Sequence, residues 1–411
     1  MSVHQSHEAS TGHPARPRAI GRPTHGGPSP SSAGGIRPRS FALLAIALLL
    51  LIASACAPQT TTLIDPGGAE VAVTRATLRE LERFAEDEQA VPLERVLYAN
   101  GYRLIDTLHV VPEKGEPLTF DWLSVAATAR WQRNGEVHIG EQVLRPARIE
   151  GIAPQMPAQP TTGPLDIAPT AAKVLGLRAP ADAAGTALEL PPASRVVLIF
   201  LDAFGYLRYT EARDAGLIPT LAAFGEPALG LTVYPPSTAV ATAALLTGAP
   251  PEVNSVEDRG IRTTFNETLF DVVAAAGLRG VAIEGDALAF NMRSADVTLS
   301  GDRDGNGGTD DNVLANALAV IEAGTPDLLW IHFHGIDDVG HTYGPGTPEE
   351  EAKIVEVDAA VATVLAALPE ETAVLIFADH GMHTVAEEGR LGNHGNLVVR
   401  DMLVPVWAFV K

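Results

Sequence analysis

The stretch from Val196 to Asp202, VVLIFLD, is an unbroken apolar run that ends in a carboxylate. A run of this length without alternation is typical of a strand buried on both faces, as in a parallel sheet covered by helices. Similar runs follow at 281–283, 328–333 and 373–377. Helical patterns separate the runs, so residues 194–411 are predicted to form an α/β domain with a mostly parallel central sheet flanked by helices.

Two helices in this half can be placed from local signals. Thr347 is a good N-cap, Pro348 suits the first helical position and Glu350 completes a capping box, so we predict a helix from there to about residue 368. A second helix is expected at 239–246, directly after a strand at 229–233.

Residues 57–150 give a weaker pattern, which we interpret as a small region of mixed structure. A helix is expected at 74–86, and extended runs are expected at 103–111 and 136–149. A Pro-rich linker at 153–164 leads to a short helix that ends near residue 177.

The first 56 residues have the composition of an export leader. Residues 1–40 carry five arginines against one glutamate among many Pro, Ser and Gly residues, so this basic segment is predicted to be disordered. The apolar run in 41–56 ends at Cys56 and is typical of a signal segment. Its last four residues, ASAC, resemble a bacterial lipoprotein signal, which implies a lipidated Cys56 and an extracytoplasmic, membrane-anchored protein. An uncleaved single-span anchor is the alternative, although the run is shorter than the ~20 residues that a span needs.

Composition excludes several classes of protein. With 46% hydrophobic residues in 411, the chain is expected to be globular with a large core. Cys56 is the only cysteine, so an internal disulfide, a cysteine metal site and a catalytic thiol are excluded from the folded part. The formal charge is −21, or −25 without residues 1–55, and we therefore expect no binding to nucleic acid polymers.

Polar residues follow the apolar runs where the predicted strands end. Because ligands bind beyond the carboxyl ends of strands in open α/β sheets, these residues are candidates for a site. They are Asp202, His332, His334, Asp337, Asp379 and His380. Six of the twelve histidines lie between His332 and His394, mixed with aspartates, a set that suits zinc and would also suit manganese or iron. Taken singly, each has an ordinary alternative as a helix cap or a hydrogen-bonded core residue.

In their order along the chain, these residues resemble the metal-site pattern of the alkaline phosphatase superfamily, particularly its nucleotide pyrophosphatase/phosphodiesterase branch, over about residues 195–411. The matching segments are FLDAFG (200–205), PST (236–238), LTG (246–248), DDVGHTYGP (337–345), ADHGM (378–382) and NHG (393–395). The resemblance implies an alkaline phosphatase-like fold and two zinc ions. One zinc would be held by Asp337, His341 and His394, and the other by Asp202, Asp379, His380 and the oxygen of Thr238.

The resemblance further implies that Thr238 is the nucleophile of a phosphoester hydrolase, with Ser237 as the alternative. Thr238 lies between a predicted strand and a predicted helix, where backbone amides can receive phosphate oxygens. An ordinary helix cap is the competing interpretation. The implied reaction is in-line displacement through a phosphothreonine intermediate.

The substrate class stays open between diesters and monoesters. Diesterases of this branch usually carry an asparagine three residues after the nucleophile, where this chain has Ala241. Related monoesterases often use a nearby arginine, yet no Arg or Lys occurs between Thr238 and Arg259. We favour a small phosphodiester or nucleotide substrate, with a phosphomonoester as the alternative. A non-catalytic, surface-anchored binding lipoprotein is a third interpretation, which the complete ligand set disfavours.

Other residues have weaker assignments. His332, His334 and His383 are expected near the metals as supporting or substrate-contacting groups. The spacing of the first part of a calcium loop occurs at Asp302, Asp304, Asn306 and Asp310, with a solvated turn as the alternative.

Residues 166–177 resemble a stretch that follows the last ligand in many members of the superfamily. We therefore hypothesise a circularly permuted order, in which residues 160–190 complete the catalytic domain by packing on its C-terminal end.

Overall fold

The structure is a computed structural model that describes residues 60–84, 90–156, 158–387 and 389–411. The predictions for the leader, the signal segment and Cys56 lie outside these residues. No helix in the described ranges combines the length and the apolar character that crossing a membrane requires. The described residues all belong to one compact unit.

The central sheet contains the predicted strands. Its members among the described residues are β10 (Arg195–Leu201), β11 (Ala228–Leu231), β12 (Gly280–Glu284), β13 (Asp296–Leu299), β14 (Leu328–Phe333), β15 (Thr372–Phe377) and β18 (Leu403–Val410), in the order β11-β18-β15-β10-β14-β12-β13. β10 pairs in parallel with β14 on one side and β15 on the other, and β12 and β13 continue the parallel arrangement. β18 is antiparallel to both β15 and β11. The prediction of an α/β fold with a mostly parallel sheet is confirmed.

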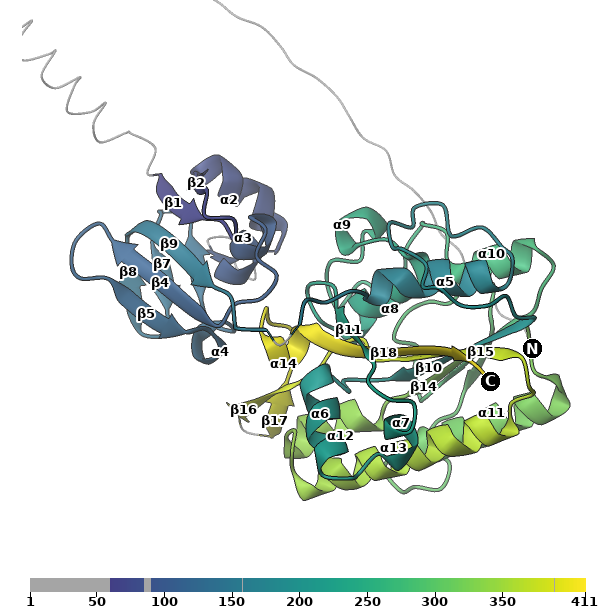
Figure 1. Cartoon of the computed structure of the whole chain (residues 1–411). Coiled ribbons are helices and arrows are strands. Elements are labelled where there is room, and N and C mark those ends of the chain that lie inside the picture. Colours follow the sequence, from purple (N-terminus) through teal and green to yellow (C-terminus); the bar gives the residue numbers. More distant parts are fainter. Residues whose placement is uncertain (1–59, 85–89, 157, 388) are drawn as a thin grey trace, which may run out of the picture. The chain divides into compact units, whose positions relative to one another are not determined.

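The sheet is buried between two layers of helices (Figure 1). Alternate residues of β10 enter different hydrophobic clusters, Val196 and Leu198 one, Val197 and Ile199 the other, as the pleat requires. The first cluster includes α5 (Ile167–Val174), α8 (Thr238–Thr247) and α10 (Leu269–Ala275). The second includes α6 (Tyr206–Asp214), α7 (Pro219–Ala222), α11 (Asp310–Gly324) and α13 (Pro348–Ala367). Burial of both faces explains why the strand sequences do not alternate.

The helix predicted from residue 347 is α13, and its capping differs from the prediction. Thr347 accepts a hydrogen bond from the Glu350 amide, as an N-cap residue does. The Glu350 carboxylate instead forms a buried ion pair with Arg208 at 2.6 Å. The reciprocal half of the capping box is therefore replaced by a tertiary contact.

Residues 160–190 pack into the α/β core. The backbone of Thr162 accepts a hydrogen bond from the Leu231 amide at 2.9 Å, next to the sheet edge. The short helix η2 (Pro164–Asp166) and α5 follow, and Ile167 and Ala171 share a cluster with Val406 near the C-terminus of the chain. The circular permutation itself remains a hypothesis.

The described residues between 60 and 152 form two small sheets, and their hydrophobic cluster also includes Tyr234, Leu397, Val398 and Met402 of the later part of the chain. One sheet has the order β2-β1-β9-β4-β5 and the other β3-β6-β7-β8. Their strands are β1 (Thr61–Ile64), β2 (Glu70–Val73), β3 (Ala90–Pro92), β4 (Thr107–Pro112), β5 (Leu118–Asp121), β6 (Arg130–Gln132), β7 (Val137–Ile139), β8 (Gln142–Leu144) and β9 (Pro146–Ile152). The accompanying helices are α2 (Arg75–Leu81), η1 (Glu82–Phe84), α3 (Leu93–Ala99) and α4 (Trp122–Val125). The run predicted at 136–149 is split into three strands, and Gly140, with φ of +56°, turns the chain between the first two, β7 and β8. The domain boundaries remain predictions.

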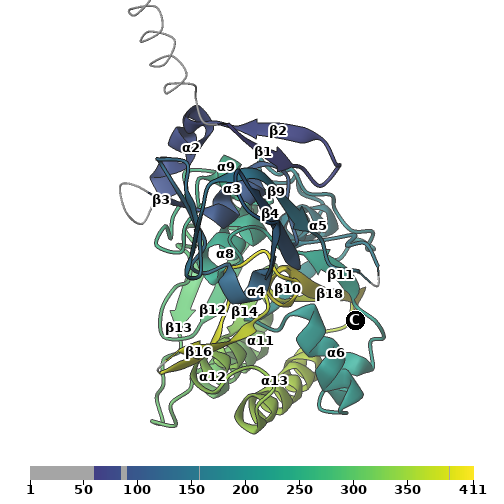
Figure 2. The ribbon, with the colours of Figure 1, turned by 90° about the vertical axis from the view of Figure 1, so that its left-hand side faces the viewer.

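Four further elements complete the described part of the α/β region. They are α9 (Pro251–Asn254), α12 (Gly335–Tyr343), the hairpin of β16 (His383–Glu387) and β17 (Arg390–Asn393), and α14 (Val399–Met402). The hairpin packs against α12 through β17, and Figure 2 shows β16 beside this helix.

Candidate active site

The candidate site lies where β10, β14 and β15 end. Asp202 directly follows β10, α12 follows β14 and carries Asp337 and His341, and Asp379 and His380 follow β15. Because the three strands are parallel neighbours, their carboxyl ends meet at one edge of the sheet. The fold therefore gathers residues that are far apart in the sequence.

The first predicted ligand set forms a cluster. Ligand atoms of Asp337, His341 and His394 lie within 4.8 Å of one another. His341 Nε2 is 3.2 Å from Asp337 Oδ2, and His394 Nε2 is 3.6 Å from Asp337 Oδ1. Asp337 and His341 are four residues apart on α12 and therefore face the same way.

The second predicted set lies beside the first. His380 Nε2 is 3.1 Å from Asp379 Oδ2 and 3.6 Å from Asp202 Oδ1, and the Thr238 hydroxyl oxygen is 3.3 Å from the same nitrogen. Ligand atoms of Asp202, Asp337 and His380 also lie within 4.8 Å of one another, which joins the two sets. The structure thus brings together all seven residues, while their assignment as ligands remains a prediction.

The three histidines of these sets are oriented alike. His341 Nδ1 lies 2.8 Å from the Gly392 carbonyl, His380 Nδ1 3.0 Å from that of Gly381, and His394 Nδ1 2.9 Å from that of Pro236. A carbonyl oxygen only accepts hydrogen bonds, so Nδ1 carries the proton in His380 and His394. Their Nε2 lone pairs then face the carboxylates, which is the orientation of a metal-binding histidine. Both ring nitrogens of His341 also lie 2.9 Å from a guanidinium nitrogen of Arg390.

The charges of the cluster also fit divalent cations. Among the described residues, one buried carboxylate oxygen each of Asp202, Asp337 and Asp379 has no hydrogen-bond partner. Burial and the charge of Asp202 raise the pKa of Asp379 well above its usual range. Burial and His380 lower the pKa of His394 to about 4, so its imidazole is neutral, as a metal ligand must be. A cation between the carboxylates would relieve their repulsion.

Thr238 is the first residue of α8, and Ser237 occupies the N-cap position. The Ser237 side chain makes no capping hydrogen bond, and within the described residues its buried hydroxyl oxygen has no partner. The first bond of the helix runs from the Ala241 amide to the Ser237 carbonyl at 2.9 Å, so earlier amides face the open end. The ordinary helix-cap role is therefore not what these hydroxyls perform.

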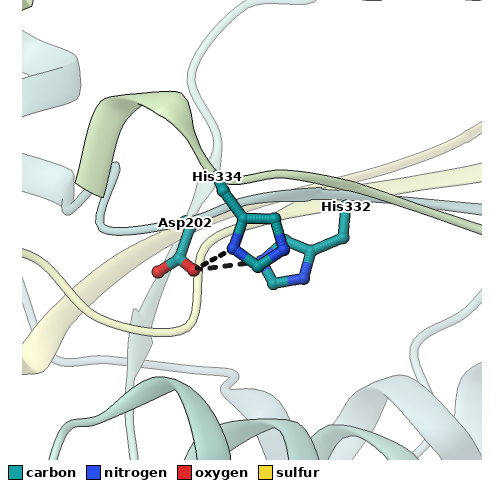
Figure 3. Close-up of side chains that lie close together, drawn as sticks. All are labelled: Asp202, His332 and His334. Atoms are coloured by element: carbon teal, nitrogen blue, oxygen red, sulfur yellow. Dashed lines mark hydrogen bonds and ion pairs between the residues drawn. The ribbon is translucent and has the colours of Figure 1, made fainter. Parts of the chain in front are cut away.

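Two further histidines hold Asp202 in place (Figure 3). His332 Nε2 lies 3.1 Å and His334 Nδ1 3.4 Å from Asp202 Oδ2. The other nitrogen of each ring faces Glu284 Oε2, at 2.9 Å for His332 and 3.3 Å for His334. Although burial opposes it, hydrogen bonding to the two histidines holds the pKa of Asp202 well below its usual range. Both histidines therefore support a proposed ligand, and Asp202, His332 and His334 together form a third group able to hold a metal.

Glu284 is a site residue that the sequence interpretation missed. It ends β12 and is completely buried. Against the effect of burial, His332 and His334 lower its pKa to about 2. Glu284 stands directly after an apolar run, as Asp202 does. The rule that identified Asp202 would therefore have identified Glu284 as well.

The other candidates are not members of the three groups that could hold a metal. His383 is buried and pairs with Asp401 at 2.8 Å. In the proposed calcium loop, Asp302 accepts hydrogen bonds from loop amides, including that of Gly305 at 2.7 Å. Asp310 instead begins α11 and accepts hydrogen bonds from the amides of His334 and Gly335. Asp310 is therefore not in the loop, and calcium binding by Asp302, Asp304 and Asn306 stays a prediction.

A residue of the N-terminal region contacts the segments that carry the site. Glu94 of α3 is buried and accepts hydrogen bonds from the Leu397 amide at 2.6 Å and the Asn396 side chain at 3.1 Å, just after His394. Tyr234, shortly before Thr238, donates to it at 3.3 Å. Burial raises the pKa of Glu94 to about 7.

Comparison with known proteins places a family domain in the same part of the chain. Residues 293–403 match the family Type I phosphodiesterase / nucleotide pyrophosphatase. The GPI ethanolamine phosphate transferase 3 catalytic subunit of Homo sapiens is 29% identical over 101 residues, 25% of this chain and 8% of that protein. GPI ethanolamine phosphate transferase 3 of Saccharomyces cerevisiae is 39% identical over 86 residues, 21% of this chain and 8% of that protein. The chain spans about a tenth of the length of these curated relatives.

Solved structures of similar architecture include two enzymes. Phosphonoacetate hydrolase from Sinorhizobium meliloti 1021, in complex with phosphonoformate, has a TM-score of 0.38 and 20% identity over 49% of this chain and 59% of that one. Human ectonucleotide pyrophosphatase / phosphodiesterase 5 has a TM-score of 0.41 and 13% identity over 53% of this chain and 87% of that one.

Proposed function

We propose that the chain is a phosphoester hydrolase of the phosphodiesterase / nucleotide pyrophosphatase type, and that it hydrolyses small phosphodiesters or nucleotide pyrophosphates with Thr238 as the nucleophile; the family match at residues 293–403 supports this. One observation carries the proposal. Three carboxylates and three imidazoles form one cluster, and the hydroxyl of Thr238, the first residue of α8, lies 3.3 Å from His380 Nε2 in it. A structural polar core would not leave unpartnered carboxylate oxygens on three neighbouring aspartates.

In the proposed reaction, Thr238 and the backbone amides of α8 have different roles. The Thr238 oxygen attacks phosphorus, forming an oxygen–phosphorus bond as the bond to the leaving oxygen breaks, and the proton of the hydroxyl is exchanged through solvent to the leaving oxygen. The open amides of α8 receive phosphate oxygens, assisted by the positive end of the helix. Water then attacks the same phosphorus, which breaks the bond to the Thr238 oxygen; one proton of the water returns to that oxygen and the phosphate product is released.

We propose two zinc ions, one held by Asp337, His341 and His394 and the other by Asp202, Asp379 and His380 with Thr238. When bound, they would neutralise charge on the attacking and leaving oxygens. Manganese or iron would suit the same nitrogen and oxygen ligands.

A direct assay tests this proposal. The full chain is assayed with bis-p-nitrophenyl phosphate and p-nitrophenyl phosphate, in the presence of zinc or of a chelator. We expect zinc-dependent hydrolysis with a preference for the diester. A preference for the monoester would support the phosphomonoesterase alternative, and the absence of metal-dependent turnover with both compounds would contradict the proposal.

A second candidate is transfer of the phosphoryl group to an alcohol instead of water. The similarity to GPI ethanolamine phosphate transferases favours it, because both reactions begin with the same displacement at phosphorus. Adding an alcohol such as ethanolamine to the diester assay separates the two. Transfer would yield its phosphodiester as the main product, whereas hydrolysis would leave product composition unchanged.

We also propose that the chain is exported and anchored outside the cytoplasm by a lipid on Cys56. The support is the ASAC segment after an apolar run. Cys56→Ser should release the protein from the membrane fraction. Retention of that variant in the membrane would instead favour the uncleaved apolar anchor.

A further inference from the structure

Three arginines line the pocket that contains the candidate nucleophile. Arg259, Arg262 and Arg390 border a cavity of about 170 Å³ together with Thr238 and Asp337. Arg259 and Arg262 come from the segment between α9 and α10, and Arg390 begins β17. The fold thus supplies the basic residues that the sequence lacks between Thr238 and Arg259.

These arginines have no carboxylate partners in the described part of the chain. Arg262 donates to the Leu288 carbonyl at 3.0 Å, and Arg390 donates to the Gly392 carbonyl at 3.2 Å. By contrast, other arginines form ion pairs, as Arg178 does with Glu267 at 2.5 Å. The Arg390 guanidinium also lies 2.9 Å from both ring nitrogens of His341. In a chain with 50 acidic against 29 basic residues, three guanidinium groups without a carboxylate partner in one pocket indicate that it receives an anion.

We propose that Arg259, Arg262 and Arg390 form an anion subsite that recognises a second negative charge on the substrate, beside the first charge of the attacked phosphoryl group. The inference rests on the proposed function, because it takes Thr238 as the attacking group. A simple diester carries one negative charge, which a metal pair alone can compensate. Three guanidinium groups suit a substrate whose second charge lies on the same phosphorus, as in a monoester, or on a neighbouring phosphorus, as in a pyrophosphate.

The size of the cavity agrees with a small anionic group. Its volume of about 170 Å³ is well below the several hundred Å³ of a typical drug-sized ligand pocket. A phosphoryl group and one charged neighbour fit such a space, and a bulky leaving group would extend outside it. The subsite therefore selects for charge near the phosphorus and tolerates variation farther away.

Binding to a non-hydrolysing protein tests the subsite independently of turnover. The full-length Thr238→Ala protein, loaded with zinc, is titrated calorimetrically with dimethyl phosphate, methyl phosphate and symmetrical dimethyl pyrophosphate. R259Q and R262Q are compared in this background, while Arg390 is retained because it contacts His341. R279Q is the matched control, since Arg279 pairs with Asp296 on the surface and its loss changes the net charge equally.

We expect R259Q and R262Q each to lower the affinity for a doubly charged probe about tenfold, which corresponds to losing one charge-assisted contact. The affinity for dimethyl phosphate should change much less. If the affinity for methyl phosphate falls, the second charge lies on the same phosphorus. If the affinity for dimethyl pyrophosphate falls, the second charge lies on the neighbouring phosphorus. Equal weakening of all three probes, or no weakening beyond that of R279Q, would overturn the subsite. Arginine-dependent binding combined with a wild-type protein that hydrolyses no phosphoester would instead overturn the proposed function alone.

Discussion

Residues 60–152 and the α/β region after residue 160 differ in how their sequences encode structure. The α/β strands are continuous apolar runs of up to eight residues, and three of the proposed metal ligands, Asp202, Asp379 and His380, follow the ends of β10 and β15. The N-terminal strands have three to seven residues and lie in two small sheets. Yet Glu94 from this second region bonds to the segments on either side of the site. The α/β region supplies the reacting groups, and the N-terminal region holds the segments that carry them.

The largest effect is expected from Asp379→Asn in the α/β region. Loss of this carboxylate should lower turnover by roughly a thousandfold, as loss of a key electrostatic group does. In chelator the same variant should be more stable, by about 1–3 kcal/mol, because a buried carboxylate beside Asp202 and Asp337 is removed. Kinetics and urea unfolding measure the two effects.

The matched control is Glu141→Gln, an exposed acid-to-amide change in the N-terminal region, which should alter neither quantity. An Asp379→Asn protein that turns over normally, or that is destabilised in chelator, would contradict the crowded carboxylate site.

A smaller effect is expected from His332→Gln. This ring joins Asp202 to Glu284, so its loss should reduce zinc affinity or turnover by about 10–100-fold. Zinc affinity is measured by competition with a chromophoric chelator. The control His109→Gln changes an exposed histidine of β4. Unchanged affinity and turnover would show that His332 only fills the core.

Glu94→Ala tests the contribution of the N-terminal region. The change leaves buried donors of Trp122, Asn396 and Leu397 without their acceptor, which should destabilise the protein by roughly 2–5 kcal/mol. We expect turnover to fall several-fold in the folded protein, because the segment after His394 loses its anchor. Glu94→Gln keeps an acceptor oxygen and should recover most of the turnover. Normal turnover in folded Glu94→Ala would mean that the N-terminal region does not support the site and only separates the α/β region from the proposed membrane anchor.

The titration of Glu94 should make the stability of the protein depend on pH, which gives a second test of the N-terminal region. The pKa of Glu94 is raised from 4.5 to about 7 by burial, and Asp401 and Tyr234 face it. Because the folded state holds the proton more tightly than the unfolded state, this stabilising contribution is complete below pH 4.5 and is lost as the pH rises through about 7. The loss amounts to at most about 3 kcal/mol. Urea unfolding at pH 5 and pH 8 should show this decrease in the wild type relative to Glu94→Gln, and a pH-independent difference would contradict it.

Much of the site could be predicted from the sequence because its residues follow long buried strands. Asp202, Asp379 and His380 stand directly after such runs, and helical spacing places Asp337 with His341. The same reasoning gave β10, β14 and β15 to within one residue.

The supporting residues could not be predicted as readily, because their roles depend on tertiary partners. Glu94 meets Leu397, which is 303 residues away in the sequence, and no local pattern marks such a pair. Arg262 resembles any surface arginine until the fold places it beside Thr238. Glu350 had a plausible local role in a capping box, but the buried cation Arg208 binds its carboxylate instead.

The central claim is that Thr238 attacks phosphorus beside two bound metal ions. Zinc content and hydrolysis of bis-p-nitrophenyl phosphate, measured together on wild type, Thr238→Ala and Ser237→Ala, test it most directly. We expect about two zinc ions in all three proteins, turnover within a few-fold of wild type for Ser237→Ala, and a loss of at least roughly a thousandfold for Thr238→Ala. Near-normal turnover by zinc-loaded Thr238→Ala, with loss in Ser237→Ala or in neither, would contradict the claim.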